Sequence, residues 1–147
     1  MTVRRAELED KLAIDRFLVG STINYRLYEI ILEALTRPGE EYIAAISTFE
    51  DRVEIVGAYG MVAGTLATAA LYGVFPLSSR MTELLSFAAH DLKKCGAEQI
   101  VAEFPDTDDF KPYRDVLLES GFTPTGLVED FYRDGIAMVI LTRKLTA

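Results

Sequence analysis

The sequence feature that most limits the fold is an uncharged run, residues 61–79, which reads MVAGTLATAALYGVFPLSS. Its hydrophobic part is too short, and too rich in Gly, Ala, Thr and Ser, to span a bilayer. A segment that lacks charge on both faces is instead typical of a strand in the middle of a sheet that helices cover on both sides. The sequence therefore predicts a central buried strand over 65–74.

Helical and strand periodicities alternate around this strand, without a repeat or a linker. The first half is expected to form a strand at 2–6, a helix over 12–18, a helix over 23–35 capped by Ser21 or Thr22 and stopped at Pro38 and Gly39, and a hairpin of 42–48 with 52–59. The central strand follows a turn bracketed by Gly60 and Gly64. After it come a helix over 80–92 ending before Gly96, a strand over 98–104, a helix ending at Gly121, and a hairpin turning at Asp134 and Gly135. This order predicts a single α/β domain covering residues 1–147.

Composition and charge narrow the class of protein. Half of the 147 residues are apolar, which is enough to bury a core, and the formal net charge is -8. Nucleic-acid binders concentrate Lys and Arg, so we expect no nucleic-acid partner. The first residues, MTVRRAELEDK, are charged where a signal peptide is apolar, and Cys95 is the only cysteine. We therefore expect a cytoplasmic protein without a membrane partner.

The last third of the chain carries the most specific pattern. Residues 110–135 read FKPYRDVLLESGFTPTGLVEDFYRDG, in which a helix ends at Gly121 and Phe122 and the next strand carries Asp130, Phe131 and Tyr132. Together with VFP at 74–76 and the order of elements, this pattern resembles the GNAT acyltransferase superfamily over essentially the whole chain.

The resemblance implies a mixed, mostly antiparallel sheet that forks between its fourth and fifth strands. Acetyl-coenzyme A, as the cosubstrate, would lay its pantetheine arm in this fork against the backbone near Leu71 to Phe75, which includes Val74. Its diphosphate would lie on the following loop and at the start of the next helix, where free amides and the helix dipole favour an anion. The implied reaction is acetyl transfer to a primary amine of a small molecule or a protein.

The loop after VFP departs from the family pattern of Arg or Gln, two residues, Gly, one residue, then Gly or Ala. An alignment without a gap places Ser79 and Met81 on the glycine sites, whereas a shortened loop places Arg80 on the basic site and leaves no glycine equivalent. Glycine matters because it lets the backbone approach phosphate oxygens. The hydroxyls of Ser78, Ser79 and Thr82 and the guanidinium of Arg80 can contact phosphates directly. The alternative is that a serine only caps the helix.

The candidate catalytic residues also depart from the family. Amine acetylation needs a base for the ammonium proton and usually an acid for the leaving thiolate. Leu117 occupies the position where the family commonly has a tyrosine acid, which leaves Tyr113 and Tyr132 as candidate acids. Each of these tyrosines has an alternative role in packing. Glu103, at the end of its strand, is the preferred candidate base, and Tyr72 is the other candidate.

Several further polar residues have both a functional and a structural interpretation. Asp106, Asp108 and Asp109 form an acidic rim with Glu103 that either recruits a cationic amine or is a solvated turn in which an aspartate caps the helix. We expect His90 to be exposed and Cys95 to be a partly buried structural thiol. Neither has the partners needed for a metal site or a nucleophile, so no metal is expected.

Two hypotheses remain open from the sequence. The first is an acyl-coenzyme A-dependent N-acyltransferase with a diverged phosphate loop and Glu103 as base. The second is a GNAT-fold binding or interaction module without transferase activity, which could act as a homodimer.

Overall fold

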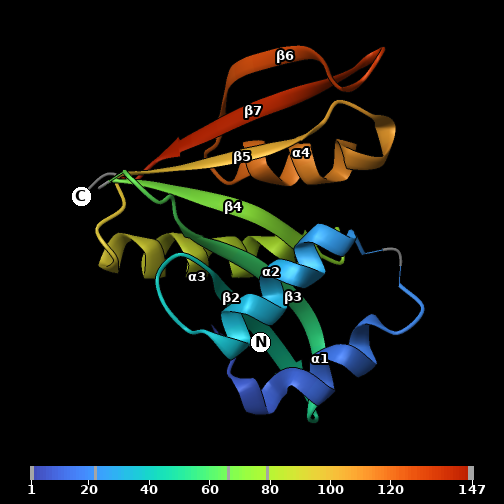
Figure 1. The fold of residues 1–147 in the computed structure, drawn as a ribbon, viewed down its shortest axis with the longest axis vertical. Helices are drawn as coiled ribbons and strands as arrows, with labels where there is room; N and C mark the ends of the chain where they lie inside the picture. Colours follow the sequence, from blue (N-terminus) through green and yellow to red (C-terminus); the bar gives the residue numbers. More distant parts are fainter. Residues whose placement is uncertain (1, 22, 66, 79, 146–147) are drawn as a thin grey trace.

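The computed structural model describes residues 2–21, 23–65, 67–78 and 80–145 (Figure 1). Its elements follow the predicted order, with two short 3₁₀ turns at Leu8–Asp10 and Asp108–Phe110 before α1 and α4. The elements are β1 (Val3–Arg5), α1 (Lys11–Leu18), α2 (Tyr25–Thr36), β2 (Ile43–Phe49), β3 (Arg52–Met61), β4 (Thr68–Phe75), α3 (Met81–Lys94), β5 (Gln99–Pro105), α4 (Lys111–Glu119), β6 (Thr123–Arg133) and β7 (Ile136–Lys144).

The described residues form one seven-stranded sheet in the order β1-β2-β3-β4-β5-β7-β6. The pair β4 and β5 is parallel, and the other neighbouring strands are antiparallel. The uncharged segment forms β4 in the middle of this sheet, as predicted. The predicted fold class, a mixed and mostly antiparallel sheet flanked by helices, is confirmed.

Two cores lie on opposite faces of the sheet. On the face that we call the α2 face, α1 and α2 bury residues such as Ile14 and Ile31 against Val56 of β3. On the other, the α3 face, α3 and α4 bury residues such as Leu84 and Leu117. Figure 1 shows α2 and α3 on either side of the strands β2 to β4. The sheet is therefore covered on both faces at its centre, which explains the absence of charge in β4.

The predicted N-cap of α2 was wrong. Asn24 is the N-cap residue, and its side-chain oxygen accepts a hydrogen bond of 2.7 Å from the backbone N–H of Arg26. Ser21 lies three residues earlier, and Thr22 lies outside the described residues. The hydrophobic pattern begins at Ile23, but this residue lies before the helix, so the pattern placed the start too early.

The predicted role of Gly60 was also wrong, whereas Gly64 does lie in the turn before β4, with a φ of +82°. Gly60 is inside β3, where the segment before β2 crosses it closely. The backbone N–H of Met61 donates to the carbonyl of Glu40 at 2.7 Å, and a Cβ at Gly60 would collide with the carbonyl of Glu41. A strand glycine of this kind permits a close backbone approach.

We therefore expect Gly60→Ala to lower the free energy of unfolding by about 1–3 kcal/mol, because backbone must move to admit the methyl group. Gly39→Ala is the matched control, since a Cβ at Gly39 meets open space. Urea unfolding of both variants measures the difference. Equal free energies of unfolding for the two variants would show that the backbone at Glu40 and Glu41 moves aside at little cost.

A buried carboxylate joins β1, β3 and α3. Asp91 of α3 accepts two hydrogen bonds of 2.8 Å from the guanidinium of Arg5 and one of 2.8 Å from the hydroxyl of Tyr59. Burial raises the pKa of Asp91, but the hydrogen bonds from Arg5 and Tyr59 outweigh it and hold this pKa below its usual value. The three-residue strand β1 is thereby fixed to the helix on the α3 face.

We expect Asp91→Asn to lower the free energy of unfolding by about 1.5–3 kcal/mol at neutral pH, because the charged hydrogen bonds are lost. A carboxyl whose pKa is lower in the folded state stabilises the fold above its unfolded pKa of about 4 and loses this effect as the pH falls through the folded value. The stability gap to wild type should therefore shrink below about pH 4. Urea unfolding across pH, with the exposed Asp109→Asn as control, tests this, and a gap independent of pH would contradict it.

Candidate active site

The sheet opens between β4 and β5. The two strands pair only from Thr68 with Gln99 to Leu71 with Ala102. Beyond that point, 72–75 and 103–105 have no pairing across the opening in the described residues, although β4 continues to pair with β3 and β5 with β7. We call this opening the fork. It leaves a row of backbone donors and acceptors on two facing strands without sheet partners.

A β-bulge marks the start of the fork. Ala58 of β3 pairs with Gly73 and Tyr59 pairs with Leu71, so Tyr72 is the extra residue. A bulge bends its strand and increases the local twist, which turns β4 away from β5. The implied fork between the fourth and fifth strands is thus present, and its position is set by one residue.

The candidate bases Tyr72 and Glu103 are the first residues beyond the last pair of the fork. Tyr72 packs on the α2 face, with its ring 5.4 Å from that of Tyr42, and its pKa is raised, mainly by burial. Ala102 and Phe104 are buried on the α3 face, so the side chain of Glu103 between them points to the α2 face, where it is exposed. The fork therefore carries a phenol and a carboxylate on the same face.

Of the two candidate acids, the structure brings Tyr132 towards Glu103. Tyr132 in β6 remains 45% exposed, and its pKa is raised by partial burial and then by the negative charge of Glu103. The phenol of Tyr132 therefore keeps its proton at neutral pH, and its raised pKa makes it a weaker acid than an ordinary tyrosine.

Tyr113 lies apart from Glu103. Its ring packs 5.3 Å from that of Phe104 and 6.2 Å from that of Phe110, in the core on the α3 face. Burial raises the pKa of this phenol. Because Phe104 and Glu103 point to opposite faces of β5, Tyr113 and Glu103 are on opposite sides of the sheet.

Leu117, at the position of the family's usual tyrosine, is fully buried near the end of α4. Its carbonyl accepts the backbone N–H of Phe122 at 3.0 Å, and Gly121 has a φ of +95°. This is a Schellman motif, in which the residue after the glycine packs against the helix. The residues Gly121 and Phe122 of the sequence pattern thus have a structural role in ending α4.

The loop between β4 and α3 lies at the end of the fork. Val74 is buried and Phe75 is half-buried, with its ring 5.7 Å from that of Phe17, so these two residues offer the fork their backbone rather than their side chains. Thr82 is exposed in the first turn of α3, and Ser79 lies outside the described residues.

Ser78 is not the N-cap residue of α3, which is Arg80. The Ser78 hydroxyl instead accepts the backbone N–H of Arg80 at 3.3 Å, which forms a small turn before the helix. The Arg80 guanidinium is bound to Glu54 of β3, with 2.9 Å between Nη1 and Oε2. Arg80 is therefore held by a contact within the loop, through its backbone, and by an ion pair with β3, through its side chain.

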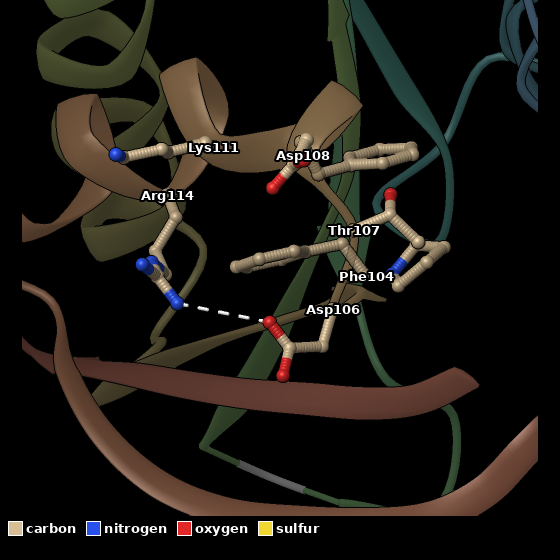
Figure 2. Close-up of a pocket in the computed structure, with 8 residues that line it drawn as sticks. Phe104, Asp106, Thr107, Asp108, Lys111 and Arg114 are labelled. Atoms are coloured by element: carbon tan, nitrogen blue, oxygen red, sulfur yellow. Dashed lines mark ion pairs between the residues drawn. The ribbon is translucent and has the colours of Figure 1, made fainter. Parts of the chain in front are cut away.

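The acidic rim borders a cavity of about 80 Å³ (Figure 2). Asp106 faces Arg114 of α4 at 3.7 Å, and Lys111 lines the same cavity as Asp108. The N-cap residue of α4 is Phe110 and that of the preceding 3₁₀ turn is Thr107, so the predicted aspartate cap was wrong. The rim is a surface of mixed charge, because two cations from α4 accompany its carboxylates.

Sequence reasoning missed a larger cavity, of about 350 Å³, beside α2. It is lined by residues of α2, among them the buried Ile30, and by Tyr42 just before β2; the full set is Tyr25, Arg26, Glu29, Ile30, Leu32, Glu33, Thr36 and Tyr42. Tyr42 contacts Tyr72, so the cavity reaches towards the fork. The repeat of polar residues at positions 25, 29, 33 and 36 was the available signal.

The remaining polar candidates have structural positions. His90 is exposed and Cys95 is half-buried, with its sulfur 3.7 Å from Nη2 of Arg5, as predicted for both. Within the described ranges, no three His, Cys, Asp or Glu side chains gather in an arrangement that could hold a metal ion. Of the helices described, none is long and apolar enough to cross a bilayer.

No protein-family model matches the sequence, and no curated protein matches it closely enough to count as a relative. The fold, however, is similar to several solved structures. A Desulfovibrio desulfuricans protein described as belonging to the GNAT acetyltransferase family superposes with a TM-score of 0.86 at 22% identity, over 99% of both chains. The aminoglycoside 6'-N-acetyltransferase of Enterococcus faecium gives a TM-score of 0.81 at 15% identity, over 100% of this chain and 98% of that chain.

A Salmonella typhimurium protein solved with its cofactor acetyl-CoA gives a TM-score of 0.75 at 16% identity, over 100% of this chain and 95% of that chain. At these identities the similarity establishes the fold. The chain therefore has the fold of the GNAT acetyltransferases, as the sequence pattern indicated.

We expect Glu103→Gln to lower the pKa of Tyr132 towards the usual tyrosine value of about 10, because a nearby carboxylate opposes formation of the phenolate. Tyrosinate absorbance measured against pH, as the difference between each protein and its Tyr132→Phe counterpart, isolates this group. The control is Glu98→Gln, an exposed carboxylate at the opposite end of β5. An unchanged Tyr132 titration in Glu103→Gln would show that the two groups do not interact.

Proposed function

We propose that this protein is an acyl-coenzyme A-dependent N-acyltransferase that transfers an acetyl group to a primary amine. The fork is the observation that carries the proposal. Two parallel strands that separate after Leu71 and Ala102 expose backbone groups that an extended amide-bearing arm can pair with as an added strand. Solved proteins of the same fold support it, since one is complexed with coenzyme A and another holds acetyl-CoA.

The residues around the fork fit acetyl-coenzyme A. The backbone of 72–75, which includes Val74 and Phe75, would pair with the pantetheine arm. The hydroxyls of Ser78, Ser79 and Thr82 and the guanidinium of Arg80 would bind the diphosphate at the start of α3. The described loop lacks the glycines of the family pattern, so its side chains rather than its backbone supply most of these contacts.

The chemistry at the fork is assigned to Glu103, on the α2 face, and to Tyr132 of β6, whose pKa the negative charge of Glu103 helps to raise. The amine nitrogen bonds to the thioester carbonyl carbon, the carbon–sulfur bond breaks, and the nitrogen loses a proton. We assign Glu103 as the group that takes this proton, directly or through a water molecule, and Tyr132 as the group that donates a proton to the leaving sulfur. Tyr113 was an equal candidate donor, but it lies on the α3 face, on the other side of the sheet from Glu103. We therefore assign the proton donor as Tyr132.

The amine would approach from the α2 face, where Glu103 is exposed. The cavity beside α2 supports this direction, because Tyr42 at its wall contacts Tyr72 at the fork. An exposed carboxylate at the fork also attracts an ammonium group. Both a small molecule and a protein side chain satisfy this geometry.

A second candidate function, a binding module that acts as a homodimer, is favoured by the surface of β6. All eleven residues of this edge strand are exposed, and they include Leu127, Val128, Phe131 and Tyr132. Large apolar side chains on an uncovered edge are typical of an interaction surface. A protein that sediments as a monomer and acetylates amines would contradict this second candidate.

We expect acetyl-coenzyme A to bind with a calorimetric signal, and Glu103→Gln to lower kcat/KM for a panel of primary amines by about 10²–10⁴-fold, as the loss of a general base predicts. Binding of acetyl-coenzyme A to the variant should be unchanged. Initial rates of thiol release and calorimetry measure the two effects.

Glu98→Gln is the matched control, because it removes a carboxylate from the other end of β5. Absence of both heat and a thermal shift with millimolar acetyl-coenzyme A would contradict the proposed function. Binding with an unchanged rate in Glu103→Gln would contradict only the role of Glu103.

A further inference from the structure

Arg80 is the basic residue of the β4–α3 loop. Between Arg52 and Lys93, it is the only Lys or Arg in the sequence. It lies directly before α3, and its side chain is 51% exposed. Its own segment of the chain therefore brings one cationic side chain to this loop, in addition to the positive end of the helix dipole.

This single cation already has an anionic partner. Oε2 of Glu54 lies 2.9 Å from Nη1 of Arg80, and the Glu54 side chain is 33% exposed. Glu54 lies two residues before Val56 in β3, and Val56 pairs with Phe75 at the end of β4. The carboxylate thus reaches from β3 to the loop just where the fork ends.

We propose that Glu54 competes with the coenzyme diphosphate for Arg80 and so sets the affinity of this protein for coenzyme A. The inference rests on the proposed function, since it places the diphosphate at this loop. A diphosphate bound to Arg80 would lie within a few ångströms of the Glu54 carboxylate, and the two anions repel each other. Binding must therefore displace Glu54 or share the guanidinium with it.

The size of the effect follows from the exposure of the pair. Exposed ion pairs have small coupling energies, which correspond to about a two- to fivefold change in a binding constant. The effect should also fall with added salt, because the Debye length is about 10 Å at 0.1 M ionic strength. Removing Glu54 should leave the fold intact, since neither core contains this side chain.

The test is calorimetric titration of coenzyme A and of pantetheine, which lacks phosphate, into four proteins at low and high salt. The proteins are wild type, Glu54→Gln, Arg80→Gln and the control Glu98→Gln. Glu98 lies after the C-terminal end of α3, whereas the β4–α3 loop precedes the N-terminal end of this helix. Glu54→Ala serves as a second variant, and thermal unfolding checks that each protein is folded.

We expect Glu54→Gln to bind coenzyme A about two- to fivefold more tightly than wild type at low salt, with a smaller gain at high salt. Arg80→Gln should bind it more weakly, and none of the substitutions should alter pantetheine binding. Detectable binding in Glu54→Gln alone would also support the proposal.

Unchanged or weaker binding of coenzyme A to Glu54→Gln, with binding to wild type intact, would overturn the role of Glu54 and leave the proposed function standing. An equal gain for pantetheine would also overturn it, because the effect would not depend on phosphate. Failure of coenzyme A to bind any of the proteins would reject the proposed function and this inference together.

Discussion

The rest of the site depends on the point at which β4 and β5 stop pairing. Four residue pairs hold these parallel strands together, and the bulge at Tyr72 then turns β4 away. Because β4 remains bonded to β3, and β5 to β7, neither strand has to unfold for the sheet to open. The opening therefore has rigid walls, and this rigidity is what a binding site for an extended ligand needs.

The same opening divides the chemistry between the two faces of the sheet. Since side chains alternate along β5, Glu103 points to the α2 face and its neighbour Phe104 points into the core on the α3 face. Tyr132 lies within the electrostatic reach of Glu103, whereas Tyr113 packs on Phe104. Buried aromatic packing and exposed polar chemistry are thus one residue apart in the sequence and on opposite sides of the sheet.

Much of the fold was predictable because its signals are local. The uncharged run at 61–79, the stripes of the helices and the Asp134-Gly135 turn each identify their own element. Gly60 was misassigned because its reason is not local: the carbonyl of Glu41 crosses it from another segment. The polar residues at positions 25, 29, 33 and 36 are a local signal for the cavity beside α2, but its wall also includes Tyr42 from outside the helix, which no local pattern connects to them.

The sequence by itself determined the order of elements and the central place of β4, because periodicity and turn residues act over a few neighbouring positions. The resemblance of residues 110–135 and of VFP at 74–76 to the GNAT family indicated the fold. The sequence also named Glu103, Tyr132 and Arg80 as candidates. Only the tertiary structure decided their partners: Glu54, for example, pairs with Arg80 across 26 positions of the chain. Side-chain partners so distant in sequence are set by sheet register and helix packing, and no local pattern records them.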